Sequence, residues 1–305
     1  MKVAIAGGNG FIGQGLSARL VEMGDEVIWL SYRPSGKPTP AGVTEFAFDP
    51  HDASGEWATA VAGADAVVNL SGYPITARWT PQVKELLLSS RVDTSRALIA
   101  AIKSAKDAGS GPATYVGACG IGIFGDRGDE VLTEDSSLGH DWLAELAHTW
   151  EDEGLAAERA GVRAVVVRTG LVLGTEGLMP RMVLPMKMFV GGPLASGKQW
   201  MPWIHYDDIT GIYAWAIHTP SVSGPVNACA PHPVRARDFS AALGKALHRP
   251  SWFPVPGFAL QLILGEVAPY MLYSQNASAR KVLDAGYQFH YPELLPALKD
   301  VVRNF

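Results

Sequence analysis

The sequence predicts an α/β protein with a doubly wound parallel sheet and a smaller C-terminal lobe. Three observations predict this fold. Short apolar runs alternate with amphipathic stretches, a glycine-rich turn follows the first apolar run, and proline and glycine become frequent after residue 170. Continuous apolar strands that alternate with helices are typical of a parallel sheet covered on both faces.

Six apolar runs have the length and composition of buried strands. The predicted strands are residues 2–7, 26–31, 43–48, 65–72, 113–118 and 163–170. Intervening segments such as "GQGLSARLVEMG" and "RVDTSRALIAAIKSAKDAG" have the amphipathic pattern of helices. Right-handed crossover connections between these strands would produce the doubly wound arrangement.

The pattern changes after residue 170, where "MPRMVLP", "GGPLASGKQWMPW" and "APHPVRARD" interrupt the helical pieces. This change indicates a second lobe that is interleaved with the sheet rather than joined to it by a linker. We predict a core formed by residues 1–170 together with about 205–230. The lobe is predicted to comprise residues 171–204 and 231–305.

Composition excludes several classes of function. The chain of 305 residues has a net charge of −5 and no long basic run, so we expect no nucleic-acid partner. Cys119 and Cys229 are too few for a disulfide framework and lack metal-ligand spacing, so we expect no metal site and a reducing compartment. The N-terminus enters a strand directly without the pattern of a signal peptide, and we therefore expect a cytoplasmic protein.

The longest apolar region, residues 252–273, is interrupted by Pro256, Gln261, Glu266 and Pro269. A membrane span needs about 20 apolar residues without such interruptions, so we expect no membrane partner. The favoured interpretation is a buried or interface helix. A contact between two copies in a homodimer stays open as a further use of this region.

A glycine-rich turn, "AGGNGFIG", follows the first predicted strand and opens a helix. Its glycines fit two spacings, G-x-G-x-x-G from Gly8 or G-x-x-G-x-x-G from Gly7. Glycine allows positive φ and close approach to a pyrophosphate, while the helix N-terminus supplies N–H donors. In this context the motif predicts dinucleotide binding rather than only a tight turn between strand and helix.

The end of the second predicted strand distinguishes NAD from NADP. The sequence there is "EVIWLSYRPSGK", with Ser31 where an acidic residue would hold the ribose 2′-OH of NAD. Arg33 follows, and Lys37 lies further along. A carboxylate would repel a 2′-phosphate, whereas Ser31 can hydrogen-bond it and Arg33 can pair with it. We predict NADP(H), with a solvated loop position as the alternative for Arg33.

Together with this turn, further segments resemble the extended short-chain dehydrogenase/reductase superfamily, in particular its atypical "epimerase family" proteins. The segments are "NLSGYPITARWTPQVKELLLSSRVDTSRAL", "WEDEGLAAERAGVRAVVVRTGLVLG", "GGPLASGKQWMPWIHYDDI", "GPVNACAP" and "GYQFHYPELLPAL". They extend over nearly the whole chain. The resemblance implies a Rossmann-like NADP-binding core and a lobe that binds a small-molecule substrate.

The resemblance also implies cofactor contacts at particular residues. The superfamily's G-x-x-G-x-x-G spacing selects Gly7, Gly10 and Gly13 as the pyrophosphate turn, with Phe11 and Ile12 supplying helix N–H groups. The other positions that it implies at the cofactor are Leu70, Ser71, Gly72, Arg91, Gly170 and Val172.

The Tyr-x-x-x-Lys pair that the superfamily uses for catalysis is absent. In the superfamily, the lysine and the cofactor ring lower the tyrosine pKa so that the tyrosine can exchange a proton. None of the nine tyrosines is followed by lysine four residues later, and "GHDWLAELAHTWEDEGLAAERAG" contains neither residue type. The segment "VGACGIGIFG" has Gly117 and Cys119 where hydroxyls are common. The catalytic residues therefore stay unassigned.

Two side chains are candidates for proton transfer. Cys119 ends the fifth predicted strand, where open α/β sheets bind ligands, although a small buried hydrophobe is an equal alternative. His205 stands beside Asp207 and Asp208 at the entry to a helix and could shuttle a proton. The favoured interpretation of that segment is structural, with Asp207 or Asp208 capping the helix.

Two functions are open at this point. The first is an NADP(H)-dependent oxidoreductase or epimerase-like enzyme that acts on an unidentified small substrate. The second is a non-catalytic NADP(H)-binding redox sensor or regulatory protein, which the missing Tyr–Lys pair supports directly.

Overall fold

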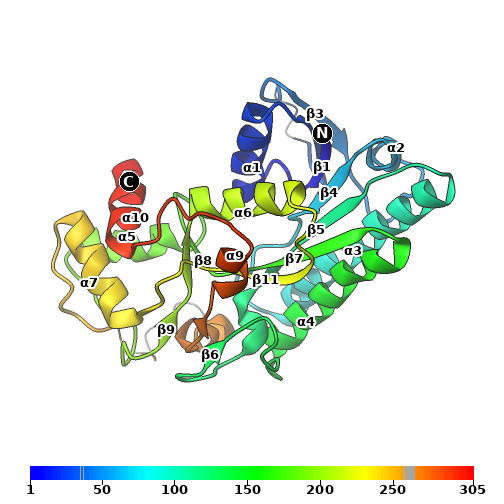
Figure 1. Ribbon diagram of the computed structural model, residues 1–305. Helices are drawn as coiled ribbons and strands as arrows, with labels where there is room; N and C mark the ends of the chain where they lie inside the picture. Colours follow the sequence, from blue (N-terminus) through cyan, green and yellow to red (C-terminus); the bar gives the residue numbers. More distant parts are fainter. Residues whose placement is uncertain (35, 37, 256, 258–264) are drawn as a thin grey trace.

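The central element is a seven-stranded parallel sheet, which confirms the predicted fold class (Figure 1). The computed structural model describes residues 1–34, 36, 38–255, 257 and 265–305. The strand order is β11-β7-β5-β4-β1-β2-β3. The strands are β1 (Lys2–Ala6), β2 (Glu26–Ser31), β3 (Val43–Ala47), β4 (Ala66–Asn69), β5 (Thr114–Gly120), β7 (Arg163–Thr169) and β11 (Gly224–Ala228).

Six of these strands coincide with the predicted runs, and β11 was not predicted as a strand. Its sequence, "GPVNA", begins with glycine and proline, which weaken any strand pattern. The structure accommodates Pro225 because β11 is the last strand of the order and pairs only with β7, with Val226 opposite Val167. A proline is tolerated at such an edge, since one side of the strand needs no ladder donor.

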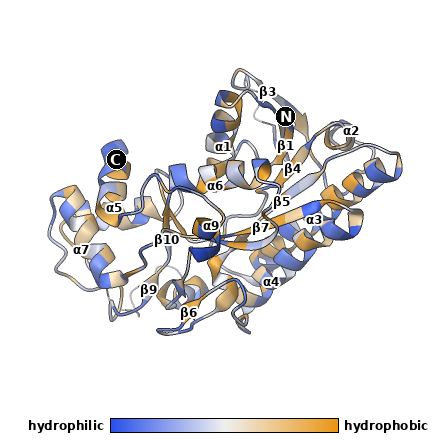
Figure 2. Ribbon diagram, viewed as in Figure 1, coloured by the Kyte–Doolittle hydropathy of each residue, from blue (hydrophilic) through white to orange (hydrophobic). Residues whose placement is uncertain are grey.

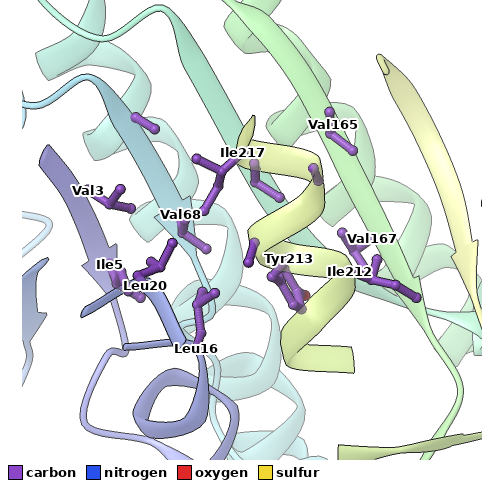
Figure 3. Packing of buried hydrophobic residues seen from close by; sticks show 14 of the residues in the cluster. Val3, Ile5, Leu16, Leu20, Val68, Val165, Val167, Ile212, Tyr213 and Ile217 are labelled. Atoms are coloured by element: carbon purple, nitrogen blue, oxygen red, sulfur yellow. The ribbon is translucent and has the colours of Figure 1, made fainter. Parts of the chain in front are cut away.

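Helices cover both faces of the sheet (Figure 1). On one face, α1 (Phe11–Glu22) and α6 (Tyr206–His218) pack side by side. Figure 3 shows Leu16 of α1 and Tyr213 of α6 in one buried cluster with the strand residues Val68 and Val167. The other face carries α2 (Glu56–Ala62), α3 (Pro81–Asp107) and α4 (Trp142–Leu155). Orange, hydrophobic colouring is concentrated along the covered strands in Figure 2.

Local capping fixes where two of these helices begin. Thr80 accepts a hydrogen bond from the N–H of Val83, and Pro81 occupies the first turn of α3. Asp141 accepts hydrogen bonds from the N–H groups of Leu143 and Ala144 at the start of α4. These caps place α3 directly after the loop that follows β4, and α4 directly beside β5.

A smaller set of elements lies at the end of the molecule away from β1–β3 (Figure 1). Its helices are α5 (Met179–Lys187), α7 (Ala236–Leu247) and α10 (Leu294–Val301), which share a core around Trp203 and Phe239. Short strand pairs accompany them: β8 (Leu171–Leu173) with β10 (Trp203–His205), β9 (Trp200–Met201) with β12 (Val234–Arg235), and β6 (Val131–Leu132) with β13 (Asn276–Ala277). Helix α9 (Arg280–Asp284) packs beside β11.

The apolar region 252–273 falls partly outside the described residues, because 256 and 258–264 are not among them. Its described end forms two short 3-10 helices, Gly265–Val267 and Pro269–Leu272. Within the part of the chain that the structure describes, no helix combines the length and apolarity needed to cross a bilayer.

Candidate functional site

The glycine-rich turn joins β1 to α1 at the carboxyl edge of the sheet. Gly7 has φ +78°, and a Cβ there would lie 3.1 Å from the backbone of Leu70 and Ser71. A Cβ on Gly13 would lie 2.5 Å from the carbonyl oxygen of Gly7, so this position also requires glycine. Gly10 is the N-cap of α1, and no side chain caps that end. The helix N-terminus therefore keeps its N–H groups for a ligand.

The structure gives Gly8 a different role from Gly7. A Cβ on Gly8 would lie 2.2 Å from Cδ1 of Trp29, whose indole packs against the turn. Trp29 is buried and donates a 2.7 Å hydrogen bond from Nε1 to Oγ of Ser17. Gly8 therefore accommodates a core side chain, whereas Gly7 provides the left-handed backbone of the turn. This difference supports the spacing that starts at Gly7.

The loop after β4 lies beside the glycine turn. Its first residue, Leu70, donates from its N–H to the carbonyl oxygen of Ala6, and Ser71 donates from its N–H to Oδ1 of Asn69. Asn69 is fully buried, and its Nδ2 lies 3.1 Å from Oγ of Ser95. This network fixes the backbone of Leu70, Ser71 and Gly72 next to the turn.

Arg91 of α3 reaches this loop from the helix beneath it. Its Nη1 donates to the carbonyl oxygens of Leu87 and Tyr73, at 2.9 and 3.2 Å, and a Cβ on Gly72 would lie 3.0 Å from its Cζ. The guanidinium also lies 4.7 Å from the ring centroid of Trp150. Arg91 is 8% exposed, and burial lowers its pKa to about 10.

No ion pair of Arg91 occurs among the described residues. A buried cation without a carboxylate is costly unless another anion compensates it. Its position beside Gly72 therefore fits an anionic ligand at the glycine turn, as predicted for the cofactor phosphates.

Ser31 and Arg33 lie at the carboxyl end of β2. Ser31 is fully buried and donates a 2.6 Å hydrogen bond to Oε1 of Glu45 on β3. Its proton is therefore engaged by a carboxylate, which the sequence prediction for Ser31 did not include. Arg33 is exposed, and its Cζ lies 5.8 Å from the ring centroid of Tyr32. Lys37 lies outside the described residues.

Helix α4, where the Tyr–Lys pair would stand, presents apolar side chains to β5. A Cβ on Gly122 would lie 3.1 Å from Leu143, and Sγ of Cys119 donates to the carbonyl oxygen of Ala147 at 3.4 Å. Leu143 and Ala147 are four residues apart and therefore share one face of the helix. Glu151, the next titratable residue on this face in the described chain, is held by Arg168, and neither Leu143 nor Ala147 can replace the missing pair.

Cys119 lies on β5 in an apolar environment. The side chain is 3% exposed, and burial, with the nearby charge of Glu151, raises the pKa of its thiol far above the usual value. Thiolates are the reactive form of cysteine, so this environment suppresses reactivity. The surroundings favour the buried-hydrophobe interpretation of Cys119.

A buried ion pair joins helix α4 to strand β7. Arg168 of β7 forms a two-fold hydrogen-bonded pair with Glu151 of α4, with N–O distances of 2.7 and 2.6 Å. Burial alone would lower the pKa of Arg168, but the hydrogen bond and charge of Glu151 outweigh it and raise that pKa. The pair fixes the register of α4 on the sheet rather than facing the glycine turn.

Gly170 and Val172 lie where the chain leaves β7. The N–H of Gly170 donates to the carbonyl oxygen of Ala228, and a Cβ there would lie 2.6 Å from the carbonyl oxygen of Pro202. Val172 pairs with Ile204 in the β8–β10 ladder. Gly170 is thus required for close packing between core and lobe, and its contact with the cofactor stays a prediction.

His205 lies on the lobe side of α6, apart from Cys119. Its Nδ1 accepts a 3.1 Å hydrogen bond from the N–H of Asp207, so His205 itself caps α6 and the predicted aspartate cap was wrong. Its Nε2 lies 3.4 Å from Oδ2 of Asp300, and its ring lies 3.8 Å from that of Tyr291. Burial lowers the pKa of His205. The negative charges of Asp207 and Asp300 act in the opposite direction and offset this effect only in part.

Asp208 holds the C-terminal segment onto α6. This fully buried carboxylate accepts hydrogen bonds from the N–H groups of His290 and Tyr291, at 2.7 and 2.9 Å, and from the hydroxyl of Tyr287 at 3.2 Å. These contacts support the structural interpretation of the "WIHYDDI" segment, and a part in proton transfer for His205 stays an untested prediction. His205 also lines a cavity of about 310 Å³ with Phe11 and Asp300.

Comparison with known proteins agrees with this arrangement. A model of the NAD dependent epimerase/dehydratase family matches residues 3–229. The chain belongs to this family. A second model, of a domain of unknown function, matches residues 255–301.

Among individual family members, the chain is similar to "Epimerase family protein YfhF" of Bacillus subtilis (strain 168), with 35% identity over 100% of this chain and 99% of the relative. It is also 35% identical to "Epimerase family protein SDR39U1" of Mus musculus, over 99% of this chain and 100% of the relative. The superfamily resemblance drawn from the motifs is thereby confirmed.

Solved family structures share the fold. The crystal structure of human epimerase family protein SDR39U1 (isoform 2) with NADPH has a TM-score of 0.85 and 32% identity, and the similarity covers 100% of both chains. The UDP-glucose 4-epimerase of Thermus thermophilus, solved with NAD, has a TM-score of 0.79 at 19% identity over 99% of both chains. The second similarity shows the shared fold only.

Sequence reasoning missed three residues that shape this site. Glu45 engages the Ser31 hydroxyl, Asn69 fixes the loop after β4, and Trp150 lies against the Arg91 guanidinium. A signal existed only for Asn69, a polar residue that ends the apolar strand "AVVN". The contacts of Glu45 and Trp150 depend on the pairing of segments that are distant in the sequence.

Proposed function

We propose that this protein binds NADP(H) at the carboxyl edge of its sheet and exchanges a hydride with a small organic substrate. The observation that carries the proposal is Arg91, a buried cation without a carboxylate partner among the described residues, placed beside Gly72. The human family member crystallised with NADPH supports the same cofactor.

The residues present fit such a cofactor. Gly7 and Gly10 form a tight turn in which a Cβ at position 7 would lie 3.1 Å from the backbone of Leu70 and Ser71, and the uncapped N-terminus of α1 offers N–H groups from Phe11 and Ile12 beside it. Arg33 supplies an exposed cation for the 2′-phosphate. A bound NADPH would contribute a hydride that the chain itself cannot supply.

The chain provides binding and orientation in this proposal, but it does not provide the superfamily's proton donor. Leu143 and Ala147 occupy the α4 face towards β5, and the buried Cys119 keeps its proton. We therefore propose that the reduced substrate takes its proton from solvent. Substrates whose reduced anion is already stabilised, such as quinones, fit this limitation better than simple ketones.

The same apolar face favours a second candidate function. A protein that binds NADP(H) without turning it over needs the glycine turn and Arg91 but no general acid. Such a protein would report the cellular ratio of NADPH to NADP⁺ to a partner, as a redox sensor or regulator. The α4 face distinguishes this candidate from typical superfamily enzymes.

Two measurements separate the candidates. NADPH and NADH are titrated by fluorescence, and NADPH oxidation is then followed with a panel of aldehydes, ketones and quinones. Tight NADPH binding with turnover of at least one carbonyl or quinone supports the oxidoreductase. Tight binding without turnover across the panel supports the sensor, and a lack of binding to either cofactor contradicts both.

The proposal extends to the compartment. Both cysteines are buried and unpaired, which suits a reducing environment such as the cytoplasm. The name of one Arabidopsis thaliana relative, 36% identical over 99% of this chain, describes that relative as chloroplastic. Fractionation of the native host cells tests the cytoplasmic placement.

A further inference from the structure

The lobe exposes a group of large apolar side chains far from the glycine turn. Trp252 and Phe253 are 76% and 57% exposed. Four further apolar side chains at and after the end of α5 are more than half exposed: Leu184, Met188, Phe189 and Val190. Exposed groups of this kind mark interaction surfaces more often than isolated surface residues do. We call these six residues the apolar tip.

The two segments of the apolar tip lie side by side. Val255 donates from its N–H to the carbonyl oxygen of Pro193, and Ala195 donates back to Val255, both at 2.9 Å. A Cβ on Gly192 would lie 2.2 Å from the carbonyl oxygen of Phe253. The tip is therefore continuous across the two segments, at the end of the molecule away from β1–β3 (Figure 1).

The two sequence ranges that contain the apolar tip carry charge of one sign. Residues 177–206 and 239–255 contain no Asp or Glu, although the chain as a whole has 30 acidic residues and a net charge of −5. The cationic side chains of these ranges are Arg181, Lys187, Lys198, Lys245 and Arg249. The segments that form the tip are thus basic and apolar, in a protein with a net negative charge.

The cationic side chain of Arg249 lies directly beside an apolar side chain of the tip. Its Cζ lies 4.7 Å from the ring centroid of Phe189, and its buried Nε has no hydrogen-bond partner among the described residues. Lys187 donates to the carbonyl oxygen of Phe305, and Arg181 donates to the carbonyl oxygen of Thr76. None of these three cations forms an ion pair with a side chain in the described part of the chain.

We propose that the apolar tip docks on the surface of an anionic phospholipid membrane. Tryptophan and phenylalanine insert at the boundary between headgroups and acyl chains, while adjacent Lys and Arg attract anionic headgroups. A second copy of the chain fits this surface less well, because a two-fold interface would bring the same cations together. This proposal departs from the sequence expectation of no membrane partner, which was based on the lack of a spanning segment, because the contact requires no such segment.

The test is flotation of the full chain with vesicles of phosphatidylcholine alone or with 30% phosphatidylserine, a composition chosen as about that of an anionic leaflet. The wild type is expected to float with the anionic vesicles, at least tenfold more than with the neutral ones, and high salt should release it. Absence of enrichment on anionic vesicles overturns the proposal.

Matched variants locate the contact. The double variant Trp252→Ser, Phe253→Ser should lose roughly tenfold or more in partition. The control Met23→Ser, Val131→Ser removes two similarly exposed apolar side chains that lie outside the apolar tip and should not change it. Arg249→Glu should lose roughly 30-fold, since each cation near an anionic leaflet contributes about fivefold, whereas Arg159→Glu on the core should change partition little. Equal losses in test and control variants contradict the proposal.

Two further measurements distinguish loss of membrane binding from unfolding and from a change in oligomeric state. Thermal unfolding at the wild-type temperature shows that each variant is folded. Light scattering then reports the oligomeric state. A dimer that Trp252→Ser, Phe253→Ser dissociates, without vesicle binding by the wild type, would assign the tip to contact between copies and overturn the membrane proposal.

Discussion

The hydroxyl of Ser31 on β2 donates a 2.6 Å hydrogen bond to the carboxylate of Glu45 on the neighbouring strand β3. Ser31 is fully buried, so this proton is directed to Glu45 rather than to solvent. A negative charge therefore lies next to the strand end where the cofactor 2′-phosphate is predicted. Affinity for NADPH then depends on the balance between this carboxylate and Arg33.

Glu45→Gln removes that negative charge and keeps an oxygen that can accept from Ser31. We expect NADPH to bind about fivefold more tightly, which corresponds to about 1 kcal/mol of relieved repulsion at a partly exposed site. NADH, which lacks the 2′-phosphate, should bind unchanged. Fluorescence titration of both cofactors measures the difference, and equal tightening of the two would place Glu45 away from the 2′-phosphate.

Arg33→Ala tests the contribution of the Arg33 cation to NADPH affinity. Removing the exposed guanidinium should weaken NADPH binding by about tenfold or more and NADH binding by less than about twofold, because a charge-assisted contact to phosphate is lost. The control is Arg159→Ala, which removes an exposed arginine from the far end of the core. Equal losses for the two cofactors would show that Arg33 does not recognise the 2′-phosphate.

Arg91→Met separates ligand binding from folding. The variant loses hydrogen bonds to Tyr73 and Leu87 but also removes a buried charge, so stability to urea should stay within about 1–2 kcal/mol of wild type. Binding of NADPH and of NADH should both weaken by roughly 30-fold or more, since both carry the pyrophosphate. A folded variant with unchanged affinity would remove Arg91 from the cofactor site.

The buried pair of Arg168 and Glu151 predicts a strong asymmetry between single and double substitutions. Glu151→Gln leaves the Arg168 charge buried and should lower the free energy of unfolding by about 3–5 kcal/mol. Replacing both partners, with Glu151→Leu and Arg168→Met, should recover most of that loss. Urea denaturation monitored by circular dichroism measures both effects, and a single variant as stable as wild type would refute the prediction.

His205 predicts a pH dependence of stability. Its pKa is lowered in the folded protein, so below the unfolded value of 6.5 the unfolded chain binds the proton more readily. The stabilisation is fully present above pH 6.5 and is lost as the pH falls towards the lower folded pKa. His205→Asn, which keeps a capping oxygen, should lose less stability than wild type between pH 7.5 and about pH 5. Equal losses in thermal unfolding temperature would exclude His205 as a contributor.

Much of the core was predictable because its signals are local. The apolar runs of β1, β2, β4, β5 and β7 have continuous hydrophobic patterns, and the turn from Gly7 to Gly13 is constrained by steric contacts within a few residues. Strand β11 escaped prediction because Gly224 and Pro225 obscure its pattern, and its stability comes from pairing with β7.

The chemistry of the site was less predictable because it depends on distant partners. Nothing next to Cys119 in the sequence indicates that α4 covers it at Ala147. The cap of α6 was assigned to the wrong residue, since a histidine with an acceptor nitrogen replaces the more usual carboxylate. The engagement of Ser31 likewise follows from the parallel pairing of β2 with β3.

The position of β11 has a consequence for synthesis on the ribosome. This strand joins β7 in the sheet, yet the chain between them, residues 170–223, first builds β8, α5, β10 and α6. A nascent chain that has emerged only as far as residue 170 exposes the unpaired edge of β7, and unpaired edges promote aggregation. The Rossmann-like core therefore cannot close until lobe segments have already left the exit tunnel, and a chaperone that shields β7 would act within this interval.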